Sequence, residues 1–497
     1  SADKDAGAAF LKYKDFKPYV DYLNSMEDEN IAQAIPNARA SQWMEENIPL
    51  FECSQKNFEE MYYYRWWTLR KHIKETPVGY GMTEFLVNRS YADKYNLIAC
   101  AIGHHIYESR WLRNPEYLNQ IIHTWYRGNE GGPMAKMTKF SSWNADAVLG
   151  RYMVDGNKEF LLDMVKDLEA EYARWEKTNR LPNGLYWQGD VQDGMEESIS
   201  GGRRKQYARP TINSYMYGNA KALSLIGIMT GDEGMAMKYG LKADSIKTLV
   251  QDKLWNTDHH FFETMRGDAS AEVREAIGYI PWYFNLPDAS SKYTVAWKEV
   301  MDEKGFSAPY GLTTAERRHP EFRTHGVGKC EWDGAIWPFA SAQTLTAMAN
   351  FMNNYPQTVL TDSVYFHHME RYVESQHHRG RPYIGEYLDE VTGYWLKGDQ
   401  ERSRYYNHST FNDLMITGLI GLRPRMDNTV EVNPLIPEGK WDYFCLDNVL
   451  YHGRNLTILW DKDGSRYQRG KGLHIYVDGK EVGHADTLTR VLCENVL

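Results

Sequence analysis

The chain has 497 residues and a formal net charge of −10, from 57 Lys plus Arg against 67 Asp plus Glu. This balance disfavours nucleic acids and anionic membrane surfaces as partners, and no apolar run approaches the roughly 20 residues that a membrane-spanning helix needs. Aromatic residues reach 14%, with 16 Trp and 35 Tyr, which exceeds what packing usually requires and indicates a function for aromatic faces.

Neither the start of the chain nor its cysteines fixes a compartment. The sequence begins at Ser1 rather than Met, as it would after removal of a leader, so export to the periplasm or the medium is one interpretation. The cysteines are scattered, odd in number and without metal-ligand spacing: Cys53, Cys100, Cys330, Cys445 and Cys493. We therefore predict no disulfide framework, no metal and no cofactor.

The first 50 residues are polar with weak helical character, and we expect them to lie against the outside of the next domain. From about residue 55 to 422 the dominant pattern is helical. Between Phe58 and Ile73, large apolar side chains recur every three or four residues, which marks one face of a helix.

Two later segments share the layout of a helical hairpin. The helices 145–153 and 160–175 flank Gly156, and the helices 217–229 and 235–254 flank Gly231. In each segment the glycine can end the first helix, and the following Asn or Asp can cap the second. Further helices are expected over residues 91–111, 115–126, 335–352, 355–374 and 410–420.

Ten to twelve helices in consecutive pairs predict a mainly α fold, a closed toroid of helical hairpins whose loops gather around a concave site. An open α-solenoid is the alternative. After about Arg423 the apolar pattern alternates, with Asp463-Gly464 and Asp478-Gly479 as tight turns, which predicts a small β unit. The predicted division is an extension over 1–50, a helical catalytic domain over 51–424 and a β domain over 425–497.

Acidic and aromatic residues are concentrated in the segment 184–198. Asp190, Asp193, Glu196 and Glu197 follow Trp187 closely. A solvated acidic loop is the simple interpretation of this pattern. A pocket in which one carboxyl group is desolvated and its pKa is raised is the functional interpretation.

A second glutamate stands in an equally functional setting, because Glu386 lies between Gly385 and Tyr387, with a histidine pair before it and Trp395 after it. Trp332, Asp333 and Trp337 begin a later helix, and we expect Trp337 to belong to the core. Trp332 and Asp333, with Arg65 in the aromatic run 63–67, are candidates to reach a cavity.

Paired carboxyl groups among aromatic faces are what glycoside hydrolysis needs, because one acid protonates the leaving oxygen and a second carboxylate activates water. The sequence has no Gly-rich phosphate loop, no His-Glu-x-x-His and no Gly-x-Ser-x-Gly. The pairs His367-His368 and His377-His378 are adjacent residues that would point apart on a helix, so we do not assign them to a metal.

These segments resemble those of the six-hairpin, or (α/α)6-barrel, glycoside hydrolases, especially the mannosylglycerate hydrolase-like and glucosidase members of glycoside hydrolase family 63. The resemblance covers about residues 45–422. Gly194-Met-Glu-Glu-Ser198 is similar to the family's Gly-Met-Asp-Asn-Ser motif, which places Glu196 on the general acid, with Glu in place of Asp. The segment 386–393 is similar to the family's base motif and places Glu386 on the base.

The resemblance implies an inverting, exo-acting glycosidase that removes a terminal, α-linked sugar, with the two carboxyl groups about 6.5–9.5 Å apart. Asp193 is the alternative acid. The candidate sugar contacts are Arg65, Trp143, Trp187, Asp190, Asp193, Trp332, Asp333 and Tyr387. Two other interpretations stay open: a polysaccharide lyase, for which Arg203-Arg-Lys205 and the histidine pairs would serve, and a glycan-binding protein without catalysis.

Overall fold

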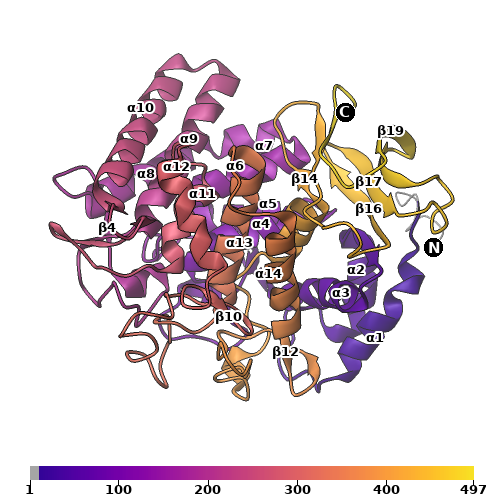
Figure 1. Cartoon of the computed structure of the whole chain (residues 1–497), viewed down its shortest axis with the longest axis horizontal. Helices are drawn as coiled ribbons and strands as arrows, with labels where there is room; N and C mark the ends of the chain where they lie inside the picture. Colours follow the sequence, from indigo (N-terminus) through magenta and orange to yellow (C-terminus); the bar gives the residue numbers. More distant parts are fainter. Residues whose placement is uncertain (1–9) are drawn as a thin grey trace.

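The computed structural model describes residues 10–497, so Ser1 lies outside the described part of the chain. Helices occupy most of its middle, and a β unit lies at one side (Figure 1). The α-helices, in chain order, are α1 (Lys17–Ser25), α2 (Asn37–Asn47), α3 (Lys56–Lys71), α4 (Ile102–Ser109), α5 (Glu116–Arg127), α6 (Asn144–Asp155), α7 (Lys158–Asp163), α8 (Val165–Asn179), α9 (Pro210–Thr230), α10 (Glu233–Leu249), α11 (Ile280–Tyr283), α12 (Ser291–Thr294), α13 (Pro338–Asn354), α14 (Asp362–Ser375) and α15 (Phe411–Leu414).

Six helices contact one another in a closed cycle. Helix α4 contacts α6, and the cycle continues through α9, α11, α13 and α15 back to α4. Every residue of α9 from Pro210 to Ala220 is buried, as expected of a helix that is enclosed on all sides. The helices α8 and α10 pack against α9, and α14 packs against α13 and α3. The core of the helical part therefore lies inside this cycle.

The two predicted helical hairpins are present. Gly156 and Gly231 end α6 and α9 with φ of 67° and 75°, a conformation that glycine adopts without steric cost. Asn157 caps α7 by accepting a hydrogen bond of 3.1 Å from the Phe160 amide, and Asp232 caps α10 through the Met235 amide at 3.0 Å. A π-helical turn (Val250–Leu254) extends α10 to the predicted end of its helix.

Two predicted helices are shorter than expected. In the segment 91–111 the α-helix begins only at Ile102, because Tyr95 and Asn96 adopt left-handed conformations with φ of 62° and 61°. In the segment 355–374 the α-helix begins at Asp362. Tyr355 is extended with φ −123° and ψ 137°, because the ring of the following Pro356 disfavours helical dihedral angles at the residue before it.

The C-terminal unit is a five-stranded antiparallel sheet in the order β1-β16-β17-β18-β19. Its strands are β1 (Leu50–Cys53), β16 (Tyr443–Tyr451), β17 (Arg454–Asp461), β18 (Gly472–Val477) and β19 (Lys480–Ala485). Ile458 faces Ile475, as the alternation predicts, and Asp478-Gly479 forms the two-residue turn between β18 and β19. Asp463-Gly464 does not form a tight turn, because it starts a longer connection from β17 to β18.

The N-terminal part of the chain also belongs to this sheet. Strand β1 pairs with β16, so residues at the predicted end of the extension complete the C-terminal unit. The Asp447 carboxylate on β16 accepts hydrogen bonds from the amides of Phe10 and Leu11 at 2.7 and 2.9 Å. Helices α1 and α2 pack against α3. The extension therefore contacts both the helices and the sheet.

The remaining strands are short. The ladders outside the main sheet are β2 (Ile73–Thr76) with β3 (Gly79–Met82), β4 (Trp187–Gln188) with β5 (Tyr207–Ala208), β8 (Met265–Arg266) and β9 (Ala269–Ser270), β6 (Trp255–Asn256) with β7 (Phe261–Phe262), β10 (Ser307–Ala308) with β11 (Gly311–Leu312), β12 (His377–His378) with β13 (Arg381–Pro382), and β14 (Leu422–Arg423) with β15 (Val430–Val432) and β20 (Val491–Cys493). Across residues 10–497, no helix combines the length and apolar character that crossing a bilayer requires.

Candidate active site

A cavity of about 380 Å³ lies at the starts of α4, α13 and α15, where the loops around residues 191–196 and 386 also converge. It is lined by Glu84, Arg89, Tyr91, Ile98, Cys100, Lys139, Phe140, Val191, Gln192, Gly194, Glu196, Arg203, Cys330, Trp337, Phe339, Glu386, Arg402, Tyr406 and His408. Both glutamates singled out in the sequence therefore line one cavity, although they are 190 positions apart in the chain.

Glu196 follows a tight turn that a glycine allows. Gly194 has φ of 73°, and a β-carbon there would lie 3.2 Å from the Cys100 sulfur. The Glu196 side chain keeps some exposure to the cavity, yet the surrounding protein desolvates it and raises its pKa to about 8, helped by the negative charge of Glu386. In the described chain no Lys or Arg nitrogen lies within 4.0 Å of its carboxyl group. A proton is therefore favoured on Glu196.

Glu386 is buried in the same cavity but has cationic neighbours. Burial raises the pKa of Glu386, while the positive charges of Lys397, Arg402 and Arg89 act against that rise. A guanidinium nitrogen of Arg402 lies 3.5 Å from Glu386 Oε1. The negative charge is therefore favoured on Glu386 and the proton on Glu196, which is the division that an acid and a base need.

The structure adds a third carboxyl group that the sequence did not point to. Glu84 is buried, and it accepts hydrogen bonds from the Tyr406 hydroxyl and, at 3.0 Å, from the Cys100 sulfur. Burial raises its pKa to about 7. No aromatic or acidic cluster surrounds Glu84 in the sequence, so only the folded chain brings it to the other two glutamates.

Four cations also line the cavity: Arg89, Lys139, Arg203 and Arg402. Among the described residues, none of the first three lies within 4.0 Å of a carboxylate, and Arg89 Nε is buried without a hydrogen-bond partner. Only Arg203 carried a signal in the sequence, as part of a basic run. The cavity thus holds more cationic groups than its own carboxylates neutralise.

Asp193, the alternative acid, lies in a different environment. Its side chain is fully buried, and Oδ2 accepts from Arg209 Nε at 2.7 Å and from the Thr211 hydroxyl at 2.5 Å. The Ser141 hydroxyl also donates to it. Asp193 does not line the cavity, and both of its oxygens are already bonded to buried side chains, so it is not placed to give a proton to a substrate there.

The other predicted sugar contacts do not line this cavity. Asp190 is buried and accepts from the Ser198 hydroxyl at 2.9 Å. Arg65 donates to Gln376 and Ser409 inside the helical core, at 2.8 and 2.7 Å. Trp187 is half-buried on β4.

The aromatic candidates mostly pack against one another. Trp143 donates to the Tyr283 hydroxyl at 3.0 Å, and Trp332 stacks on Trp337 with ring centres 4.7 Å apart. Tyr387 also stacks on Trp337, with ring centres 4.5 Å apart. Trp337 itself, expected in the core, is buried and also lines the cavity. Asp333 is fully buried and accepts from the Gly326 amide at 3.1 Å.

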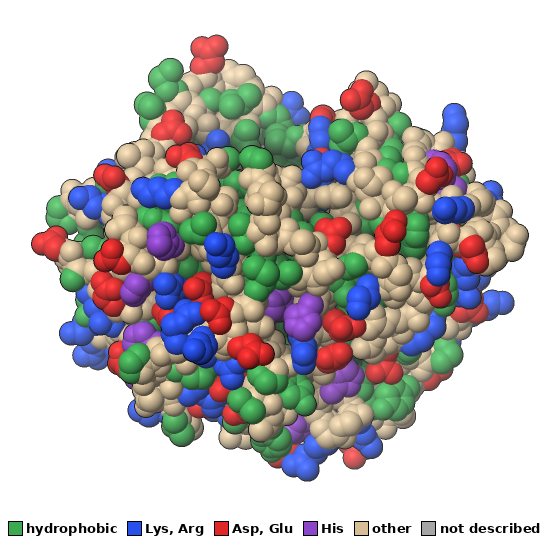
Figure 2. Space-filling model, viewed as in Figure 1, with side chains coloured by type: hydrophobic (Ala, Val, Ile, Leu, Met, Phe, Trp, Pro, Cys, Tyr) green, Lys and Arg blue, Asp and Glu red, His purple; other side chains and the backbone are tan. Residues whose placement is uncertain are grey.

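A larger cavity of about 680 Å³ is lined by residues of the same inner helices, α4, α6, α9, α11, α13 and α15, and by the start of the C-terminal unit. It opens between the α9–α10 pair and the C-terminal unit, where the outline of Figure 2 is hollowed. It holds two acids from these helices, but Asp413 is already bonded to Arg110 Nε at 2.9 Å and to Trp111 Nε1 at 2.8 Å. Asp146 accepts from the Tyr107 hydroxyl at 2.6 Å, so the inner helices supply no pair of available carboxyl groups here.

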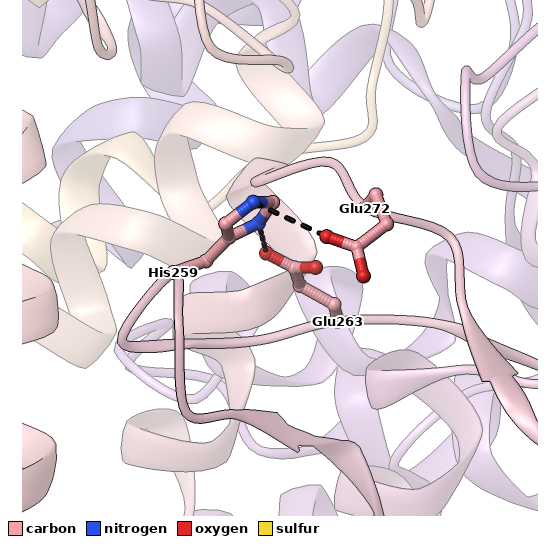
Figure 3. Close-up of side chains that lie close together, drawn as sticks. All are labelled: His259, Glu263 and Glu272. Atoms are coloured by element: carbon pink, nitrogen blue, oxygen red, sulfur yellow. Dashed lines mark hydrogen bonds and ion pairs between the residues drawn. The ribbon is translucent and has the colours of Figure 1, made fainter.

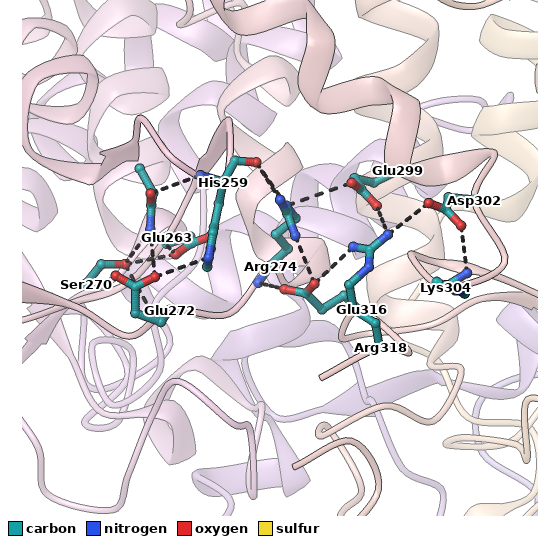
Figure 4. Close-up of polar contacts among 11 residues, drawn as sticks. His259, Glu263, Ser270, Glu272, Arg274, Glu299, Asp302, Lys304, Glu316 and Arg318 are labelled. Atoms are coloured by element: carbon teal, nitrogen blue, oxygen red, sulfur yellow. Dashed lines mark hydrogen bonds and ion pairs between the residues drawn. The ribbon is translucent and has the colours of Figure 1, made fainter. Parts of the chain in front are cut away.

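One group of residues outside both cavities has the donor types of a metal site. His259, Glu263 and Glu272 place one ligand atom each within 4.8 Å of one another (Figure 3). Both nitrogens of His259 already face carboxylates, at 2.7 Å from Glu263 and 3.2 Å from Glu272. Arg274, which donates to the His259 carbonyl, continues the contacts to Glu316, and Arg318 connects Glu316 with Glu299 and Asp302 (Figure 4). This network fastens the loops between α10 and α13.

Family models match most of the chain. Residues 94–409 match the model described as mannosylglycerate hydrolase MGH1-like glycoside hydrolase domain. Residues 422–484 match the model of the C-terminal domain of glycosyl hydrolase family 65. The first match covers more than half of the chain and includes both Glu196 and Glu386.

Solved structures with the same fold include one named sialidase, which is 83% identical over 100% of this chain with a TM-score of 0.99. This chain covers only 46% of that protein's length. A GH63 mannosylglycerate hydrolase from Thermus thermophilus, solved with Tris and D-glycerate, is 11% identical over 71% of this chain and 98% of its own, with a TM-score of 0.54. A GH78 rhamnosidase of Bacillus sp. GL1 is 13% identical over 86% of this chain and 41% of its own, with a TM-score of 0.56. At 11% and 13% identity the likeness shows the fold alone.

Proposed function

Because the chain belongs to the family of mannosylglycerate hydrolase MGH1-like glycoside hydrolases, it is a glycoside hydrolase, and we propose that it removes a terminal sugar with inversion at the anomeric carbon. Glu196 is the proposed general acid and Glu386 the proposed general base. The single observation that supports this assignment is the presence of both carboxyl groups in one cavity, with cations near Glu386 and, among the described residues, no Lys or Arg nitrogen within 4.0 Å of Glu196.

In the proposed reaction, the Glu386 carboxylate takes a proton from a water molecule as the water oxygen bonds to the anomeric carbon. The bond from that carbon to the glycosidic oxygen breaks, and Glu196 transfers its proton to the departing oxygen. The closed cycle of helices supports a six-hairpin toroid with this cavity at one mouth. The exo mode and the α linkage are proposed from the family likeness alone.

The two glutamates predict different kinetics for their glutamine variants. Glu386→Gln cannot accept the water's proton, so hydrolysis should fall by roughly 10²- to 10⁴-fold for every leaving group. Glu196→Gln should lose as much with a sugar leaving group, but much less with an activated aryl glycoside whose phenolate departs without protonation. The measurement is kcat/KM for both variants on a matched pair of substrates.

The stereochemistry of the first product tests the inverting mechanism separately. Proton NMR during early turnover should show the anomer opposite in configuration to the substrate. A product of retained configuration would contradict the role of Glu386 as a base, because retention needs it as a nucleophile about 5 Å from the acid.

We further propose that the substrate carries an acidic group. The cavity holds Arg89, Lys139 and Arg203 without carboxylate partners among the described residues, and a bound carboxylate would offset part of this positive charge. The GH63 neighbour solved with D-glycerate is named for a substrate with such a group. The name of the sialidase-named relative also refers to an acidic sugar, although this chain spans less than half of it.

Arg203→Met should then raise KM for an acidic glycoside by about tenfold, the effect of losing one charged hydrogen bond, and leave KM for a neutral glycoside unchanged. Arg204→Met is the matched control, since Arg204 is exposed and does not line the cavity. Equal effects of Arg203→Met on both substrates would contradict an acidic substrate.

A polysaccharide lyase is the second candidate, because Tyr91, Tyr406 and His408 line the same cationic cavity and a lyase needs such a base beside a neutralised uronate. β-Elimination by a lyase would release an unsaturated product that absorbs in the ultraviolet, whereas hydrolysis forms no unsaturated product. Assay of one uronate-containing oligosaccharide for ultraviolet absorbance and for reducing ends distinguishes the two reactions.

A further inference from the structure

Glu84 is a carboxyl group in the active-site cavity with no part in the proposed reaction. It follows β3, and its side chain lines the cavity together with Glu196 and Glu386. It is 4% exposed, so it cannot be a solvated surface acid. In the described chain no Lys or Arg lies within 4.0 Å of it. A buried, unpaired carboxyl group is costly to keep unless it contributes to the function of the site.

Two donors from distant parts of the chain hold this carboxyl group in place. The Tyr406 hydroxyl donates to Oε2, and the Cys100 thiol donates to Oε1 at 3.0 Å. The backbone of the same residue is fixed as well, because its carbonyl accepts from the Asn407 amide at 2.9 Å. Donors to both oxygens favour the ionised form, although burial opposes it.

We propose that Glu84 is a positioning residue whose negative charge, held by Tyr406 and Cys100, helps to keep the proton on Glu196 and so moves the alkaline limit of hydrolysis to higher pH. This inference rests on the proposed function, in which Glu196 is the acid. A negative charge in the same desolvated cavity makes ionisation of Glu196 less favourable, which is the effect of like charges that share a site.

The titratable and charged groups around Glu84 are those expected for such coupling. Burial is the main cause of the raised pKa values of Glu84, Glu196 and Tyr91. The Glu386 charge adds to the rise at Glu84, the Glu84 charge adds to the rise at Tyr91, and the charges of Glu386, Asp190 and Glu84 add to the rise at Glu196. Cys100 and Tyr406 complete its surroundings. The pKa of Glu84 is about 7, so its charge develops in the range where Glu196 must still hold its proton.

The test is the pH dependence of kcat/KM in the Glu84→Gln variant of the full chain. Glutamine keeps the size and can still accept from Tyr406, but it carries no charge. The alkaline limb of the profile, where kcat/KM falls with rising pH, should therefore move to lower pH by roughly one unit, because Glu196 now ionises more easily. Tyr406→Phe removes a donor that favours the ionised form of Glu84, so it should move the limb in the same direction by less.

Glu171→Gln is a matched control. Glu171 is also buried and accepts from a tyrosine, Tyr126, at 2.7 Å, but it lies on α8 and does not line the cavity. This variant should keep the wild-type limb. A limb that stays in place in Glu84→Gln, or that moves equally in Glu171→Gln, would overturn the proposal, as would loss of hydrolysis at every pH in Glu84→Gln alone.

Failure of the proposed function would look different. If Glu196→Gln still shows an alkaline limb with a sugar leaving group, Glu196 is not the acid, whatever the profile of Glu84→Gln. If Glu196→Gln lacks the limb and Glu84→Gln keeps it at the wild-type pH, the acid assignment holds and only the role of Glu84 is wrong.

Discussion

At the scale of single residues, the neighbours of a carboxyl group decide its role more than its position in a motif does. Glu196 and Asp193 are three residues apart in one acidic loop. Glu196 faces other carboxyl groups in a cavity and is favoured in its protonated form, whereas Asp193 forms a buried ion pair with Arg209 and accepts hydrogen bonds from two hydroxyl groups. Within three residues, Glu196 is placed to act on a substrate and Asp193 is placed to stabilise the fold.

This difference predicts that Asp193→Asn destabilises the fold without changing the leaving-group dependence. Removing one partner of a fully buried ion pair leaves the Arg209 charge uncompensated, which should lower the free energy of unfolding by about 3–5 kcal/mol. Urea unfolding of the purified variant measures it.

Glu197→Gln, in the same loop, is the control for Asp193→Asn. Glu197 lies 3.9 Å from a Lys329 nitrogen that is itself mostly exposed, so its loss should cost less than about 1 kcal/mol. An Asp193→Asn variant of normal stability, with slow hydrolysis of sugar leaving groups only, would instead make Asp193 the acid.

Glu196 and Glu386 could be predicted from the sequence, because the residue pattern and the family resemblance pointed to the same two positions. The fold brings both side chains to one cavity. The aromatic contacts were harder to predict. Trp143 and Trp332 were candidate sugar contacts, yet both pack among other rings, whereas Trp337 was expected in the core and lines the cavity. A run of aromatic residues does not reveal which ring faces a cavity and which faces a helix.

At the scale of elements, helix ends that are marked by a glycine in the sequence were predictable, whereas contacts between distant parts of the chain were not. Gly156 and Gly231 end helices where the sequence indicated. The helix at 91–111 was overestimated, because its apolar spacing continues through a segment with left-handed residues. Strand β1 pairs with β16 almost 400 positions later, and no periodicity in residues 50–53 points to that partner. Glu84 was missed for the same reason.

At the scale of the whole molecule, the cycle of helices separates two cavities and encloses many titratable groups. Carboxyl groups that fold into this interior take up protons, and histidines that fold into it release them. The free energy of unfolding should therefore fall at high pH, where the buried carboxyl groups lose their protons. It should also fall at low pH, where histidines that are buried in the neutral form become protonated.

The last prediction is a maximum of stability between about pH 5 and pH 6.5, where buried carboxyl groups and buried histidines act in opposite directions, followed by a decline as the pH rises further. Burial raises the pKa values of Glu84, Glu108 and Asp146 to about 7 and that of Glu196 to about 8. Above about pH 5 the unfolded chain has lost these protons while the folded protein keeps them, so the stabilising contribution of these four carboxyl groups is lost progressively as the pH rises to about 8.

Buried histidines act in the opposite direction on the acidic side. Burial lowers the pKa of His72 to about 3 and those of His105 and His368 to about 4. Below about pH 6.5 the unfolded chain therefore binds protons that the folded protein does not, and stability falls with falling pH. Thermal unfolding between about pH 5 and pH 9 measures both limbs. Asp146→Asn cannot hold the extra proton, so it should flatten the alkaline decline, and a midpoint that rises steadily to pH 8 would contradict the argument.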